Sequence, residues 1–214
     1  MSNLIDILIA GGPVMVPLMF ASIAVVALAI ERSIFWWRVK KQQKRVARSV
    51  LQLYQDDPAL AENKLKQHLD LPTARVFLEA ISLSNATPNE FRLALDGATQ
   101  AEIPSLKRFN NIFETIVGLA PLLGLLGTVT GLIRSFGSLT LGDLGGSKTV
   151  GVTAGISEAL VSTAAGLVVA VFALIAANTF RTFYVQQVAY LDECCTQLEL
   201  LQMRSHRQQG VSRV

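Results

Sequence analysis

The sequence has almost none of the residues that build disulfide frameworks or metal sites. The 214-residue chain holds two cysteines, Cys194 and Cys195, which are adjacent, and two histidines, His68 and His206, which lie far apart. A disulfide framework joins separate segments of a chain, and no CxxC or HExxH spacing is present. We therefore expect no structural disulfide, no metal site, no cofactor and no enzymatic activity.

Charged residues are also scarce, and no phosphate-binding loop is present. Only 16% of the residues are charged whereas 51% are hydrophobic, and the mean hydropathy is +0.42. This balance is too apolar for an ordinary soluble domain. The Gly-Leu-Leu-Gly of residues 124–127 lies inside an apolar run and follows no predicted strand, so it is not a nucleotide fingerprint. The net charge of +3 does not indicate nucleic-acid binding, because the basic residues follow a membrane pattern instead.

Three long apolar runs predict an all-α membrane protein. They are Pro13–Ile30, Thr115–Ile133 and Gly151–Phe180, and Glu158 is the only charged residue among them. A helix needs about 20 apolar residues to cross a hydrocarbon core of ~30 Å. Runs of this length without strict alternation do not fit the strands of a β-barrel. We predict transmembrane helices over residues 13–37, 112–136 and 151–180.

The basic residues predict the orientation of these helices. All but two of the 19 Lys and Arg residues fall in segments 31–114 and 181–214, the exceptions being Arg134 and Lys148. The positive-inside rule places those segments in the cytoplasm. The N-terminus and the loop 137–150 are then periplasmic, and the C-terminus is cytoplasmic. No basic residue precedes the first run, which argues against a cleavable signal, and residues 1–12 are expected to form a short interfacial helix.

A basic cluster follows the first predicted span. It can bind anionic phospholipid, at about 1 kcal/mol for each basic residue near the surface. It can also act only as a stop-transfer and orientation signal. The cluster comprises Arg38, Lys40, Lys41, Lys44 and Arg45.

The second and third spans are expected to extend far into the cytoplasm, beside helices in 38–111. Thr87, Pro88 and Glu90 form a predicted helix start with a capping box. A helix over 88–136 would be roughly 70 Å long. Pro104 and Pro121 are expected to bend this helix rather than end it, a break at Pro104 being the alternative. The C-terminal segment 181–214 repeats apolar residues in a 4-3-4-3 spacing, which predicts packing either on the chain's own helices or between subunits. The repeat comprises Tyr184, Val188, Leu191, Cys195 and Leu198.

Polar residues inside the spans are the candidate functional residues. A carboxylate such as Glu158 costs about 2.5–3.5 kcal/mol inside a span, and such residues often mark proton or cation paths. Glu158 can instead be an interfacial residue near the outer mouth. Thr128 on the second span is expected at a similar depth, and Ser162 and Thr163 follow on the third. These hydroxyls can line a proton path, or can simply bond backbone carbonyls and join helices.

Small residues are dense in the second and third spans, whereas the first is rich in Leu, Val and Met. Small faces let helices approach closely in lipid, so the last two spans are expected to form the interior or the oligomer contacts. Three helices cannot enclose a pore alone, so an oligomeric ring is expected. The packing glycines are Gly124, Gly127, Gly131, Gly155 and Gly166.

Two motifs resemble the MotA/TolQ/ExbB proton-channel family, most closely its ExbB and TolQ branch. The first is Gly124-Leu-Leu-Gly-Thr128-Val-Thr-Gly131. The second is Gly155-Ile-Ser-Glu158-Ala-Leu-Val-Ser-Thr163-Ala-Ala-Gly166. The resemblance covers all three spans and their cytoplasmic extensions. Many relatives have a proline where this chain has Phe172, so the third helix is expected to be straighter here.

The resemblance implies a ring of five subunits around a dimer of an ExbD- or TolR-like protein with a single span. An aspartate of that partner carries the proton, while Thr128, Glu158 and Thr163 take the places of the residues that line the path. Proton flow then drives a TonB- or TolA-like protein that acts on the outer membrane.

Two other functions are weighed against a motor subunit. A membrane scaffold would use the helices only to hold a partner and would conduct nothing. A small-solute transporter would need repeats or broken helices, and three spans without internal symmetry argue against it. Whether such a ring would serve nutrient uptake or envelope maintenance does not follow from the sequence.

Overall fold

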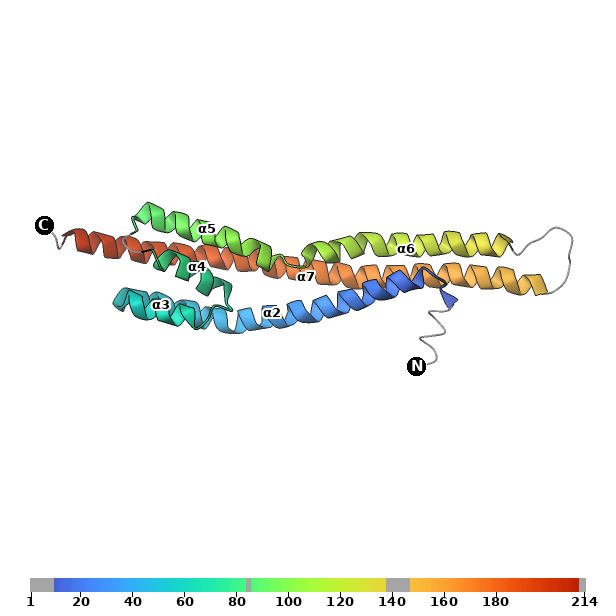
Figure 1. The fold of residues 1–214 in the computed structure, drawn as a ribbon, viewed down its shortest axis with the longest axis horizontal. Helices are drawn as coiled ribbons and strands as arrows, with labels where there is room; N and C mark the ends of the chain where they lie inside the picture. Colours follow the sequence, from blue (N-terminus) through green and yellow to red (C-terminus); the bar gives the residue numbers. More distant parts are fainter. Residues whose placement is uncertain (1–9, 84–85, 138–146, 212–214) are drawn as a thin grey trace. The chain divides into compact units, whose positions relative to one another are not determined.

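A computed structural model describes residues 10–83, 86–137 and 147–211, with side chains for all of these except 147–150 and 206–211. The interfacial helix expected over residues 1–12 lies almost entirely outside this part. Regular structure in the described ranges is α-helix throughout (Figure 1). The helices are α2 (Met15–Asp56), α3 (Pro58–Lys66), α4 (Pro72–Ile81), α5 (Pro88–Leu106), α6 (Asn110–Gly137) and α7 (Ser147–Val211).

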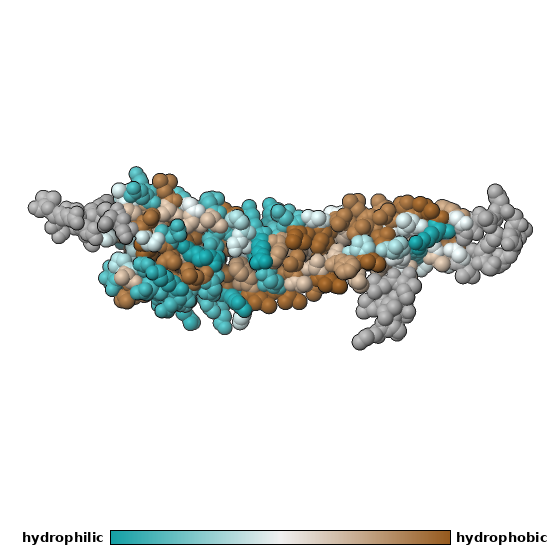
Figure 2. Space-filling view, in the orientation of Figure 1, coloured by the Kyte–Doolittle hydropathy of each residue, from teal (hydrophilic) through white to brown (hydrophobic). Residues whose placement is uncertain are grey.

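Three stretches of helix are long and apolar enough to cross a membrane, which confirms the all-α prediction with three spans. They are Met15–Asp56, Pro88–Gly137 and Gly151–Ser205. The chain forms two compact units, one from Met1–Glu31 with Phe109–Phe180 and the other from Arg32–Arg108 with Arg181–Val214. Figure 2 shows a mostly apolar surface on the first unit and a largely polar surface on the second. This is the composition of a multi-pass membrane protein with water-exposed helical parts.

The first unit is organised by the close packing of α6 against the part of α7 that precedes Arg181 (Figure 1). A Cβ placed on Gly131 would lie 2.7 Å from the Gly155 carbonyl oxygen, and one on Gly166 would lie 2.6 Å from the Ala120 carbonyl oxygen. Gly124, Gly127 and Gly155 are equally confined. The five glycines of the motifs therefore pack two helices of the same chain, and their faces are already covered there.

The outer surfaces of these helices are apolar as well. Large apolar side chains are exposed not only on α2 but also on α6 and α7 of the first unit: Leu122, Ile133 and Phe172 are each more than 60% exposed. The last two spans thus turn their small residues toward each other and their bulky residues outward. Close backbone packing needs small residues on the contact face, and the bulky residues of these two helices lie largely on the outside.

Two helix boundaries differ from the predicted ones. The third long helix begins at Ser147 instead of residue 151, and runs without interruption to Val211. The helix expected over 88–136 is interrupted between Leu106 and Asn110, where Phe109 has a φ of 67°. Pro104 and Pro121 both lie inside helices, so neither ends one. The break begins after Leu106 and coincides with the left-handed backbone of Phe109.

Arg32 stabilises the end of α5 at this break. Its Nη2 donates to the Leu106 carbonyl oxygen at 2.6 Å, and its side chain is 2% exposed. The last carbonyls of a helix lack intrahelical partners and carry partial negative charge, so a guanidinium satisfies both needs. At the opposite end of α5, the predicted capping box of Thr87 and Glu90 is confirmed.

The second unit buries the C-terminal repeat within the chain. Leu191 and Leu198 are fully buried, and the Thr99 hydroxyl of α5 lies 3.7 Å from the Cys195 sulfur. Gln43 of α2 and Gln187 of α7 exchange two amide hydrogen bonds, of 2.8 and 3.2 Å. The repeat therefore packs on the chain's own helices. Both cysteines are free thiols, and burial raises the pKa of Cys195 to about 11.

We predict that Gly131→Ala destabilises the protein and that Gly118→Ala does not. An added methyl on Gly131 would meet the Gly155 carbonyl at 2.7 Å and the Ala159 nitrogen at 2.9 Å, whereas one on Gly118 meets nothing within 4 Å. Forcing the helices apart should cost about 1–3 kcal/mol. The thermal unfolding midpoint of each detergent-solubilised variant checks this, and equal midpoints would contradict it.

Candidate ion-pathway and lipid sites

Glu158 is paired with Arg134 across the α6–α7 contact. Arg134 Nη1 donates to Glu158 Oε1 at 2.7 Å and to Oε2 at 2.9 Å. The carboxylate side chain is 13% exposed, whereas the arginine side chain is 55% exposed. Sequence reasoning placed Arg134 only at the outer end of its span and missed this pair. The signal available was the antiparallel order of the two spans, which brings the end of one beside the start of the next.

The turn before α2 closes over the same carboxylate. Gly12 has a φ of +71°, in the left-handed region that glycine adopts without strain. A Cβ at this position would overlap Glu158 Oε1, so the backbone of the turn lies directly against the carboxylate. Glu158 is therefore enclosed by three segments: the turn, α6 and its own helix.

The three hydroxyls predicted near Glu158 have different surroundings. Thr128 is half-buried and donates to the Leu125 carbonyl of its own helix at 2.6 Å. Thr163 is also half-buried, but it donates to the Gly124 carbonyl of the neighbouring helix at 3.1 Å. Neither hydroxyl bonds to Glu158. Both still reach the surface of the first unit.

The expected place of Ser162 on a pore surface is wrong for this chain. Its side chain is 0% exposed and donates to the Ala159 carbonyl at 3.0 Å. A Cβ on Gly127 would overlap the Ser162 hydroxyl. The serine side chain therefore occupies the space that the missing side chain of this glycine leaves. Ser162 joins helices and lines no surface of the described chain. Ser135, which sequence reasoning did not single out, joins them too, by donating to the Val152 carbonyl at 3.1 Å.

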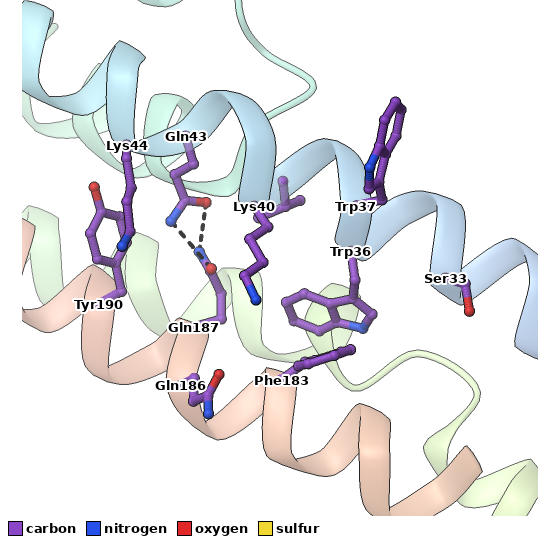
Figure 3. A pocket seen from close by; sticks show the side chains of 11 residues that line it. Ser33, Trp36, Trp37, Lys40, Gln43, Lys44, Phe183, Gln186, Gln187 and Tyr190 are labelled. Atoms are coloured by element: carbon purple, nitrogen blue, oxygen red, sulfur yellow. Dashed lines mark hydrogen bonds between the residues drawn. The ribbon is translucent and has the colours of Figure 1, made fainter.

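The basic cluster borders a cavity in the second unit. All five residues of the cluster, Arg38, Lys40, Lys41, Lys44 and Arg45, are exposed. Lys40 and Lys44 line a cavity of about 450 Å³ between α2 and α7 (Figure 3). Its other lining residues include Trp36, Phe183 and the Gln43–Gln187 pair. Aromatic, amide and cationic groups thus converge on one space.

Trp36 is the buried polar group of this cavity. The side chain is 6% exposed and its indole N–H has no hydrogen-bond partner among the described residues. The neighbouring Trp37 is 63% exposed, and Lys41 Nζ lies 4.8 Å from its ring centroid. A buried donor without a partner is costly.

Comparison with known proteins now identifies the family. Residues 60–193 match the model of the MotA/TolQ/ExbB proton channel family. The chain belongs to this family. It is 55% identical to the ExbB-like 3 biopolymer transport protein of Synechocystis sp. over 199 residues, which cover 93% of this chain and 95% of that protein.

Other relatives place the chain in the ExbB branch. The ExbB-like 1 biopolymer transport protein of Synechocystis sp. is 39% identical, over 93% of this chain and 79% of that protein. The biopolymer transport protein ExbB of Salmonella typhimurium is 28% identical, over 89% of this chain and 81% of that protein. The resemblance to the MotA/TolQ/ExbB family and its ExbB branch is therefore confirmed.

We predict that Thr163→Val destabilises this ExbB-like chain more than Thr128→Val does. The Thr163 hydroxyl bonds to another helix, whereas that of Thr128 bonds only to its own. Hydrogen bonds between membrane helices contribute about 0.6 kcal/mol on average and up to ~1.7 kcal/mol. Unfolding in detergent with a denaturant series measures both losses. An equal loss in the two variants would show that the Thr163 bond does not stabilise the pair.

Proposed function

We propose that this chain is the ring-forming subunit of a motor in the bacterial inner membrane that is driven by the proton-motive force. Its N-terminus is periplasmic, and the polar second unit and the C-terminus are cytoplasmic. The ring is a homopentamer that holds a dimer of a single-span, ExbD- or TolR-like protein in its pore. Through a TonB- or TolA-like protein, the motor energises outer-membrane work such as nutrient import. The observation that supports this most is a carboxylate held inside an apolar unit of a proton channel family member.

The apolar surface of the first unit supports the proposal of a ring. The glycines of α6 and α7 are used within the chain, so neighbouring subunits must meet through other residues. Exposed side chains such as Leu122, Leu160 and Phe172 offer that contact, or a contact with lipid. Large exposed apolar surfaces mark protein or membrane contacts. Three spans cannot enclose a pore alone, and several copies can.

The residues of the first unit that can exchange a proton or form hydrogen bonds support the proposed proton path. Glu158 is the one carboxylate within the apolar stretch Gly151–Phe180. Thr128 and Thr163 lie at the surface of the same unit, whereas Ser162 is buried and drops out of the path. One carboxylate per chain is little for a complete relay, which fits a mobile carboxylate supplied by the single-span partner. The non-conducting scaffold remains the competing function.

We expect Glu158→Gln to abolish proton flux and leave the ring assembled, because glutamine keeps the shape of the side chain and cannot release a proton. Proton flux is measured in proteoliposomes that contain the complex with its co-purified partner, and assembly by native mass spectrometry. Glu114→Gln, an exposed glutamate earlier on α6, is the matched control and should conduct normally. Normal flux in Glu158→Gln would favour the scaffold.

We also propose that the cavity beside Trp36 binds the headgroup of an anionic phospholipid. Lys40 and Lys44 supply positive charge, the indole N–H supplies a donor, and Trp36 and Phe183 supply apolar contact for the start of the acyl chains (Figure 3). Arg38, Lys41 and Arg45 add charge on the exposed surface of the same helix. In this proposal the basic cluster binds lipid in addition to acting as an orientation signal.

Neutralising the cavity lysines should reduce the phosphatidylglycerol that stays bound. At about 1 kcal/mol for each basic residue near the surface, each of Lys40→Gln and Lys44→Gln should weaken retention about fivefold. Native mass spectrometry of protein from phosphatidylglycerol nanodiscs measures this. Lys66→Gln with Arg92→Gln, exposed residues of α3 and α5, is the control. Equal lipid retention in all variants would leave the cluster as an orientation signal only.

A further inference from the structure

We propose that Arg134 is a positioning residue for Glu158, which holds its carboxylate in an engaged state that must be released before Glu158 can exchange a proton. The proposal rests on the proposed role of Glu158 in the proton path. It assigns a resting state to the chain and a residue that controls it.

Two hydrogen bonds join Arg134 to Glu158. One nitrogen, Arg134 Nη1, donates to both Glu158 oxygens, at 2.7 and 2.9 Å. Charge-assisted bonds of this length are about twice as strong as neutral ones. Both carboxylate oxygens therefore accept a hydrogen bond from the same cation, which holds the carboxylate in one engaged position.

The two side chains of the pair differ in their exposure. Glu158 is 13% exposed while Arg134 is 55% exposed, so only the arginine side of the pair is open. Both bonds use Nη1, and a guanidinium has five N–H donors. The donors on Nε and Nη2 remain for an outside group. A second carboxylate, such as that of a partner's membrane helix, can bind there and draw Arg134 away from Glu158.

The turn at Gly12 covers Glu158 without adding a charge. It lies against Glu158 Oε1 and brings no charged or titratable side chain to it. Arg134 of α6 is the only charged side chain that contacts Glu158 in the described part of the chain. The carboxylate is thus covered by backbone on one side and by arginine on the other. Movement of Arg134 is the route to release that needs no change in the backbone.

Carbodiimide labelling of the assembled complex tests this proposal. Dicyclohexylcarbodiimide adds to protonated carboxyl groups in apolar surroundings and spares carboxylates held by a cation. Arg134→Gln removes the cation and should raise the labelling rate of Glu158 by up to about fivefold, as measured by peptide mass spectrometry. Arg134→Lys keeps a cation and should restore a rate near that of the wild type. Arg181→Gln, an exposed arginine of α7, should change nothing.

The outcomes separate this inference from the proposed function. Equal labelling rates in the wild type and Arg134→Gln would overturn the positioning role, whatever the proton flux. Failure of Arg134→Lys to restore slow labelling would overturn it as well, because a lost packing contact would then explain the result. Normal proton flux in Glu158→Gln would overturn the proposed function instead. If Arg134→Gln does not assemble, Arg134→Met, which keeps an unbranched side chain and removes the charge, gives the same comparison.

Discussion

The close approach of α6 and α7 is the constraint on which the rest of the first unit depends. At Gly131, Gly155 and Gly166 the two backbones leave no room for a Cβ. Lipid gives helices no hydrophobic reason to associate, so packing and hydrogen bonds must hold them together. This contact also sets the register between the two helices. The polar interactions between the two helices follow from that register.

The register decides which hydroxyls join helices and which charge finds a partner. It seats Ser162 against Gly127, directs Thr163 to the Gly124 carbonyl, and places Arg134 beside Glu158. A carboxylate in an apolar span is expensive alone, and the arginine offsets that cost within the chain. The pairing leaves both oxygens of Glu158 bonded within the chain.

The second unit applies the opposite chemistry to similar helices. Its core joins apolar residues such as Leu191 and Leu198 to a buried amide pair, Gln43 with Gln187. Arg32 donates to the last carbonyl of α5, just before the left-handed Phe109 interrupts the helix. The aromatic and basic lining of the nearby cavity gives this unit a feature that suits a phospholipid headgroup. The first unit is thus built on an apolar helix pair, and the second is a polar helical layer.

The sequence by itself determined the three apolar helices, the capped start of α5 and the family, because composition, periodicity and short motifs are local properties. It also singled out Glu158 and the five packing glycines by residue type. The tertiary structure alone decided what those residues contact: Arg134 for Glu158, the neighbouring helix for Thr163 and burial for Ser162. Such pairings depend on the register between segments that are 20 or more residues apart, and the side-chain pattern of one helix does not specify that register. For the same reason the sequence did not locate the helix break after Leu106, whose carbonyl accepts a hydrogen bond from the buried Arg32.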